Sequence, residues 1–324
     1  MKNLNTKFLF FEINFSSLKN IIRASFFLLF SLNVHAQDLP SDSLSYIEPV
    51  FIENSKEVKN TFISTRIING HSVQTLEKGI LEFRIEHKFG DFAGGEGGPN
   101  TLFGLDNATD IRFGFEYGIS DNLMLGLGRS RGNGSPYRSL MDGFIKYRLF
   151  RQGKSNCPIS ASLLGTSSFT YMSKSVLENE ITSYPKFAHR FAYCSQLNIA
   201  RQFYKKVSIS IMPTLIVRNY VKYNDQTILF SLGGAINYAF NSNLAVNIEF
   251  YPSVMESNIR LRREGFYNSF AFGLDWATFG HNFKLFLTNS TGFGETQFIP
   301  YTNTLWSKGQ FRLGFCIGRK YVKE

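Results

Sequence analysis

The sequence predicts an all-β protein: a transmembrane antiparallel β-barrel of about twelve strands, with short periplasmic turns and long external loops. Three observations predict it. Apolar and polar residues alternate in many short stretches, the connections between these stretches alternate between long and short, and 16% of the 324 residues are aromatic while only 19% are charged. The mature part of the chain has no apolar stretch near the roughly 18 residues that a membrane-spanning helix needs.

The stretch 110–130 shows the alternation clearly. Ile111 and Phe113 fall on one face of an extended chain, and Arg112 between them falls on the other. This period of two indicates a strand with one apolar and one polar face. Residues 119–122 supply a short turn, after which the alternation resumes. Two strands of about nine residues are not stable alone, so we expect a larger, closed sheet.

Similar stretches recur at fairly even spacing to the C-terminus, and an even number of strands leaves both chain ends on the periplasmic side. Residues 61–79 are ambiguous, because they fit either another strand or a segment tucked against the end of the barrel. The twelve expected strands lie near 80–89, 110–118, 123–130, 141–150, 158–170, 190–200, 207–217, 227–239, 244–251, 266–276, 281–288 and 310–321.

The connections between these stretches carry a second signal. Short connections are expected at 119–122 and 151–156. Short turns on one side and long loops on the other are the habit of bacterial outer-membrane barrels. The longer connections lie at 90–108, 131–138, 172–188, 219–225, 253–264 and 290–308.

A soluble β-protein would show the same period with its apolar face inward. Three features argue against it. A barrel of about twelve strands is too wide for its own side chains to fill. The polar face often carries Gly, Ser, Asn or Cys rather than the Lys and Glu of a wall that faces water. Tyr and Phe gather near strand ends, where aromatic girdles meet a membrane surface.

The N-terminus has the pattern of a secretory signal. Lys19 and Arg23 precede an apolar run, and residues 34–36 place small side chains at the cleavage position. We therefore expect a signal peptide at 1–36, a periplasmic lead-in at 37–60 and an outer-membrane β-barrel domain at 61–324. The formal net charge of +10 is spread thinly, so we expect no nucleic-acid partner.

The sequence gives little support to metal, cofactor or catalytic chemistry. The three cysteines, Cys157, Cys194 and Cys316, lack CxxC spacing, and we expect no metal and no cofactor. A lipid hydrolase would need a Ser and a His that activate each other. No GxSxG elbow is present, so we expect no enzyme. The histidines available in the mature chain are His71, His87, His189 and His281.

The candidate functional residues are charges on the polar face of the expected strands. If the apolar face meets lipid, these charges point into the lumen, where opposite charges on neighbouring strands pair and narrow or select a pore. The alternative is a salt-bridged interior that only neutralises an occluded lumen. The residues are Glu82, Arg84, Glu86, Lys88, Arg112, Glu116, Lys146 and Arg148.

The last long loop is unusually aromatic for a loop in water. We expect it to fold into the mouth of the barrel as a constriction; the alternative is that it binds a partner. The aromatic residues are Phe293, Phe298, Tyr301 and Trp306.

Three phrases carry a resemblance to a known family: TLEKGILEFRIEHKFG, LFGLDNATDIRFGFEYGISDNLMLGLGRS and FGHNFKLFLTNSTGFGETQF. They resemble an uncharacterised Bacteroidota family of outer-membrane β-barrels, a domain of unknown function, and the likeness extends over about 61–321. The resemblance implies the same architecture and location, and it brings no catalytic residues with it.

These observations predict a channel or binding protein for a small polar solute in the cell outer membrane. Its expected partners are outer-membrane lipid and either the small polar solute or a protein in the periplasm or at the surface. The alternative is a closed structural barrel that presents long loops to a partner protein. A lipid hydrolase is a distant third.

Overall fold

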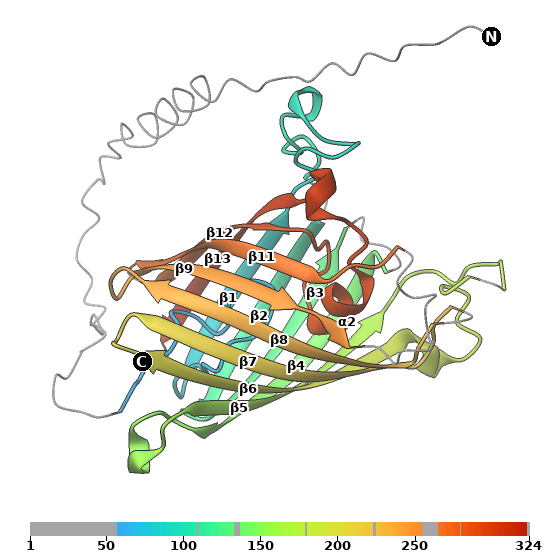
Figure 1. Cartoon of the computed structure of the whole chain (residues 1–324). Helices are drawn as coiled ribbons and strands as arrows, with labels where there is room; N and C mark the ends of the chain where they lie inside the picture. The colour runs from blue at the N-terminus through green and yellow to red at the C-terminus, as the bar shows by residue number, and fades with distance from the viewer. Residues whose placement is uncertain are drawn as a thin grey trace, which may run out of the picture. The chain divides into compact units, whose positions relative to one another are not determined.

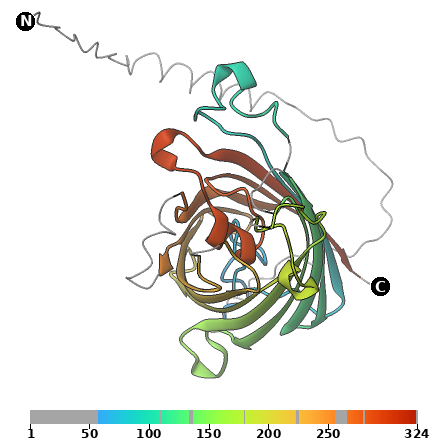
Figure 2. The same cartoon turned by 90° about the vertical axis from the view of Figure 1, so that its right-hand side faces the viewer.

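A computed structural model describes residues 57–322, except 109, 133–136, 179, 223–224, 255–264 and 279. The expected signal peptide, most of the expected lead-in and most of the expected loop 253–264 lie outside these residues. The described chain forms one large antiparallel sheet that curls into a barrel (Figures 1 and 2). Among the described residues, no helix is long and apolar enough to cross a membrane.

The strands of the sheet match the expected ones closely, and the helices are few and short. The helical elements are η1 (Pro99–Thr101), η2 (Lys154–Asn156), η3 (Phe187–Arg190), α2 (Glu295–Tyr301) and η5 (Trp306–Lys308). The strands are β1 (Ile80–Lys88), β2 (Asp110–Ser120), β3 (Leu123–Arg131), β4 (Ser139–Phe150), β5 (Ser160–Thr170), β6 (Phe191–Phe203), β7 (Val207–Arg218), β8 (Ile228–Ala239), β9 (Leu244–Tyr251), β10 (Ser253–Val254), β11 (Ser269–Thr278), β12 (His281–Thr288) and β13 (Arg312–Val322).

Apart from the short β10, each strand pairs with the strands before and after it in the chain, and the first pairs with the last. Ile80 of β1 lies opposite Val322 of β13, which closes the barrel. The two-residue strand β10 follows β9 after Pro252, and both pair with β8. Proline cannot donate to the ladder, which explains the break. Counting β9 and β10 as one, the wall has twelve strands, which confirms the prediction.

The connections alternate in length around the barrel as predicted, with one exception: 151–159, expected as the short connection 151–156, has nine residues, whereas 132–138, expected to be longer, has seven. At the end where β1 begins and β13 finishes, which we call the terminus end, the turns are 121–122, 151–159, 204–206, 240–243 and 279–280. At the opposite end, which we call the loop end, the connections are 89–109, 132–138, 171–190, 219–227, 255–268 and 289–311.

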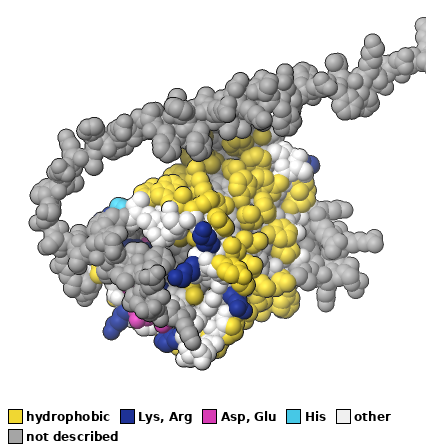
Figure 3. Space-filling model, turned by 60° about the vertical axis from the view of Figure 1, so that its left-hand side comes forward, with side chains coloured by type: hydrophobic (Ala, Val, Ile, Leu, Met, Phe, Trp, Pro, Cys, Tyr) yellow, Lys and Arg dark blue, Asp and Glu magenta, His cyan; other side chains and the backbone are white. Residues whose placement is uncertain are grey.

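The two faces of the wall have opposite character. The polar residues of β1, such as Glu82 and Arg84, are fully buried, and the apolar residues between them face outward. On the outer face Phe115 is 56% exposed and Leu127 is 70% exposed. Figure 3 shows this face covered with apolar side chains. Buried charge within an apolar exterior is the reverse of a soluble barrel, so the soluble alternative is wrong.

Residues 61–76, which we call the lumen segment, lie inside the barrel rather than in its wall or against its end. Every residue of the segment except Ile63 is buried. Figure 2 shows this part of the chain, in blue, within the ring of strands. Its only β-bridge is internal, between Arg66 and His71. Within the described residues, the segment therefore joins no wall ladder.

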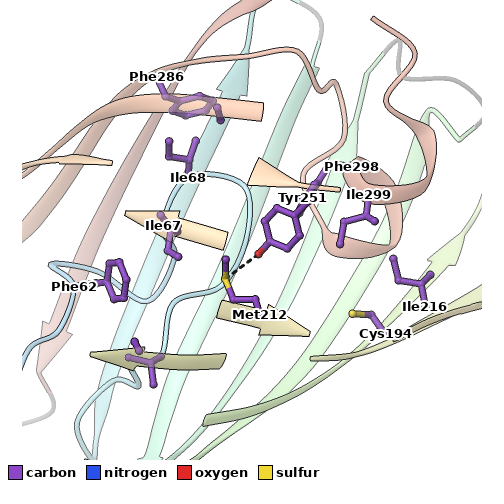
Figure 4. Packing of buried hydrophobic residues seen from close by; sticks show 14 of the residues in the cluster. Phe62, Ile67, Ile68, Cys194, Met212, Ile216, Tyr251, Phe286, Phe298 and Ile299 are labelled. Carbon is purple, nitrogen blue, oxygen red and sulfur yellow. Dashed lines mark hydrogen bonds between the residues drawn. The ribbon is translucent and has the colours of Figure 1, made fainter. Parts of the chain in front are cut away.

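An apolar core forms where the lumen segment meets the wall. Phe62 and Ile67 of the segment belong to one buried cluster with Met212 of β7 and Tyr251 of β9 (Figure 4). The turn of the segment must pass very close to this tyrosine. A Cβ added at Gly70 would lie 2.0 Å from the Tyr251 hydroxyl oxygen, so only glycine fits there.

Candidate functional site: the occupied lumen

Charges on β1 and β2 bind the first half of the lumen segment. The Glu116 carboxylate accepts hydrogen bonds from the Thr65 hydroxyl, at 2.8 Å, and from Arg66 Nε, at 3.3 Å. Arg84 Nη2 donates to the same Thr65 hydroxyl at 2.9 Å and to Glu82 at 2.6 Å. These groups are buried, so each charge is neutralised by a partner of opposite sign.

Lys146 of β4 binds the backbone of the segment rather than a carboxylate. Its ammonium donates to the carbonyl oxygens of Thr65 (2.9 Å), Ser72 (3.2 Å) and Gln74 (2.7 Å). An ammonium has three N–H donors, so all of them are used. Arg148, two residues further along β4, donates to the Gln74 side-chain oxygen at 3.0 Å.

Glu249 of β9 binds the opposite kind of backbone group. Its carboxylate accepts from the backbone N–H groups of Ile68, Asn69 and Gly70, each at 3.1 Å. Successive N–H groups that converge in a turn form a concave site for an anion. Here the turn belongs to the lumen segment and the anion belongs to the wall, so Glu249 fixes the tip of the segment.

Arg112 of β2 links two carboxylates on other strands, Glu86 of β1 and Asp142 of β4. It donates to Glu86 at 2.9 Å and to Asp142 of β4 at 2.6 Å, reaching across β3. The reach is possible because Gly128 of β3 has no side chain: a Cβ there would lie 2.3 Å from Arg112 Nη2. Glu86 lies 3.9 Å from Arg66 of the segment, which extends the network inward.

The loop between β12 and β13 fills the lumen from the loop end. Helix α2 lies inside the ring of strands (Figure 2), and Glu295 and Phe298 on it are buried. The Glu295 carboxylate accepts from the His71 backbone N–H at 3.1 Å. The Phe298 and Tyr251 rings pack edge-on, with their ring centres 5.0 Å apart. The lumen segment and α2 therefore touch inside the barrel.

All eight charged residues predicted for the lumen point inward and are buried. They do not line an open space, because each binds the lumen segment or another charge. Glu86 pairs with Arg66 of the segment, while Glu82 and Arg112 act through other wall charges. The residues that hydrogen bond directly to the segment are Arg84, Lys88, Glu116, Lys146 and Arg148.

Three of the four aromatic residues predicted for a constriction lie inside the mouth. Phe293, Phe298 and Tyr301 are buried. Trp306 is a correction: its ring stacks on Phe311 at 4.6 Å and meets outward-facing Phe270 at 5.4 Å. It follows α2, where the chain has already returned to the rim, and it packs on the outside.

Several residues of this site were missed by sequence reasoning. Asp142 and Glu249 lie on the inward parity of their strands, so the alternation could have identified them. Arg66 and Glu295 lie in segments without a period, and nothing local marked them. Some inward-facing positions of the strands carry apolar residues, which a water-filled lumen would not favour. These residues could have indicated that the lumen is filled. They include Met124, Phe144, Leu164, Met212, Ile216 and Phe286.

The residues considered for other chemistry are scattered. His71 lies in the lumen against Phe144, whereas His87 lies on the outer face and stacks on Phe315. His189 stacks on Tyr220, and His281 on the outer face contacts Arg319. The three cysteines are free thiols. Within the described part of the chain, no group of three or more His, Cys, Asp or Glu residues could hold a metal ion.

An apolar exterior, a closed strand ladder and a charged interior define a membrane β-barrel, here with its lumen occupied by its own chain. The protein belongs to the family described as membrane bound beta barrel domain (DUF5777), whose model matches residues 62–321. This confirms the resemblance to a barrel family of unknown function. The restriction of that family to Bacteroidota stays a prediction.

Solved outer-membrane barrels are similar to this chain in a remote way. The NanC porin matches with a TM-score of 0.44 and 9% identity, over 75% of this chain and 100% of that one. The KdgM porin matches with a TM-score of 0.44 and 10% identity, over 76% of this chain and 99% of that one. An outer membrane channel from Pseudomonas putida F1 matches with a TM-score of 0.41 and 14% identity, over 77% of this chain and 98% of that one. A search of curated proteins found no match.

Proposed function

We propose that this protein is an outer-membrane barrel through which a small polar solute passes, and that the lumen segment closes the pathway until it is displaced. One observation carries the proposal. The segment fills the lumen, yet in the described residues it is joined to the wall by side-chain contacts and not by a strand ladder. The ladder closes through β1 and β13 without it.

The lumen that the segment would leave behind suits a polar solute. Its wall presents Lys146, Glu116 and Glu249, each of which now hydrogen bonds to the segment. Water and solute would replace the hydrogen bonds that the segment now makes. Charged groups lining a passage favour entry of ions and polar molecules over apolar ones. Because both signs of charge are present, we expect only weak preference between anions and cations.

Recordings in a planar lipid bilayer test this proposal. We expect the mature wild type to be closed most of the time and to open in brief steps. A variant lacking 61–76 should conduct steadily, because α2 alone then remains in the lumen and has lost its contact with the segment. A deletion of the same length at 41–56 serves as the matched control and should behave like the wild type. Heat-dependent gel migration verifies that each variant has folded as a barrel.

A second function is favoured by the direct contact between the lumen segment and α2, which fills the barrel from both ends. In this alternative the protein is a closed barrel that presents its long loops to a partner protein. The same recordings separate the two. A wild type that never opens, beside a deletion variant that conducts, would contradict the gated pathway and favour the closed barrel.

A further inference from the structure

The outer face of β3 carries positive charge at the loop end, where the rest of the face is apolar. Arg129 and Arg131 lie on the outward parity and are exposed, on either side of buried Ser130. The cross-strand neighbours of Arg129 are Phe113 on β2 and Met141 on β4, which are 43% and 50% exposed. An arginine among side chains that face lipid is costly unless it finds a polar partner.

A third arginine completes a cluster around an open cavity. Arg131 and the exposed Arg138, which precedes β4, line a cavity of about 530 Å³ together with Tyr171. Tyr171 also orients the remaining arginine. Its hydroxyl accepts from Arg129 Nε at 3.0 Å, and its ring centre lies 5.3 Å from the guanidinium carbon. Arg131 and Arg138 therefore line a hollow at the loop end, and Arg129 lies beside it through its contact with Tyr171.

These three arginines differ from those in the lumen in how their charge is balanced. In the lumen, Arg66, Arg84 and Arg112 each lie next to at least one carboxylate. Among the described residues, no carboxylate forms an ion pair with Arg129, Arg131 or Arg138. Three positive charges thus meet the edge of the membrane without an anion from the described protein.

We propose that Arg129, Arg131 and Arg138 bind the phosphate of an anionic lipid headgroup in the leaflet that surrounds the loop end. A guanidinium presents a planar fork of donors that matches phosphate oxygens. Long basic side chains at the rim of a membrane protein extend their charged ends into the headgroup layer. The position on the outer face of a membrane barrel selects a lipid over a phosphate in solution. This site is independent of the proposed pathway.

The site is tested by measuring, with native mass spectrometry, how tightly the purified, detergent-solubilised mature protein binds phosphatidic acid. Phosphatidylcholine and inorganic phosphate are the comparison probes. We expect the variant R129Q/R131Q/R138Q to bind phosphatidic acid roughly a hundredfold more weakly, since each basic side chain near an anionic surface contributes about fivefold. All three positions are exposed, so the barrel should fold, which heat-dependent gel migration verifies.

The matched control removes the same charge at the terminus end. Arg201, Lys205 and Lys206 are exposed there, and R201Q/K205Q/K206Q should bind phosphatidic acid as the wild type does. Equal loss in both triple variants would overturn the proposal, because it would show a general effect of net charge. Full competition by inorganic phosphate at millimolar concentration would also overturn it, because the ligand would then be free phosphate and not a lipid.

Discussion

At the scale of single residues, two wall charges hold the lumen segment by its backbone. Glu249 accepts from three backbone N–H groups, and Lys146 donates to three carbonyl oxygens. A buried charge is tolerated when all its hydrogen-bonding capacity is used. Because both residues bind backbone atoms, they fix the path of the segment's backbone and place little restriction on which side chains it carries.

Replacing Glu249 should loosen the tip of the segment. In the variant Glu249→Gln the carboxylate becomes a neutral amide, which weakens its bonds to the three N–H groups. With a loss of about 2 kcal/mol, typical of hydrogen bonds to a charged group, the open fraction in bilayer recordings should rise roughly thirtyfold. Glu180→Gln, in an exposed loop at the loop end, is the control and should change nothing. An unchanged open fraction in the Glu249 variant would contradict this account.

The inward charges could be predicted residue by residue, but their partners could not. The parity of a strand decides which face a side chain takes, and Glu116 and Lys146 were placed in this way. Their partners on the lumen segment are far away in the sequence and follow no period. Contacts such as Arg66 with Glu116, or Glu249 with the turn at Gly70, become visible only when the barrel is closed around the segment.

At the scale of elements, the wall and its contents obey different rules. A wall strand satisfies its backbone through two neighbours and shows a period of two, so its position is legible in the sequence. The lumen segment is buried on all sides and satisfies much of its backbone through side chains, so it has no period. Helix α2 is similar. The inward fold of its loop was predicted, but a seven-residue helix containing Pro300 was not.

A disulfide between the segment and the wall should prevent opening. The hydroxyl oxygens of Thr61 and Ser160 are 3.4 Å apart, so T61C/S160C places two thiols in reach of each other in a background that lacks the native cysteines. We expect the oxidised variant to lose the brief openings of the wild type and to regain them on reduction. The control N237C/N247C joins two wall strands through side chains that are 2.9 Å apart and should leave the openings unchanged. Openings that persist in oxidised T61C/S160C would show that the base of the segment need not move.

At the scale of the whole molecule, the barrel solves a problem of width. A ring of twelve strands is too wide for its own inward side chains to fill. Here the lumen segment and α2 occupy the remaining space, and one apolar cluster joins both to the wall. The interior is thus packed like a protein core while the exterior is apolar like the membrane it meets.

The location of the whole molecule is a separate prediction. We expect the mature protein in the outer-membrane fraction of the cell, and we expect unheated samples to migrate differently from heated ones on a gel because a closed strand ladder resists detergent. Cell fractionation and gel migration measure the two. Recovery in the soluble periplasm without a heat-dependent shift would contradict the membrane barrel.

The lumen segment both enters and leaves the barrel at the terminus end. The backbone N–H of Val58 donates to the Gln152 carbonyl at 2.8 Å, and that of Lys78 donates to the Asp121 carboxylate at 3.0 Å, both in turns at this end. The chain inside the barrel is therefore a loop that enters and leaves at the same end, and it does not run from one end of the barrel to the other. Such a loop can enter a barrel that has already closed, and leave it again. Neither step requires a chain end to move through the barrel or two wall strands to separate.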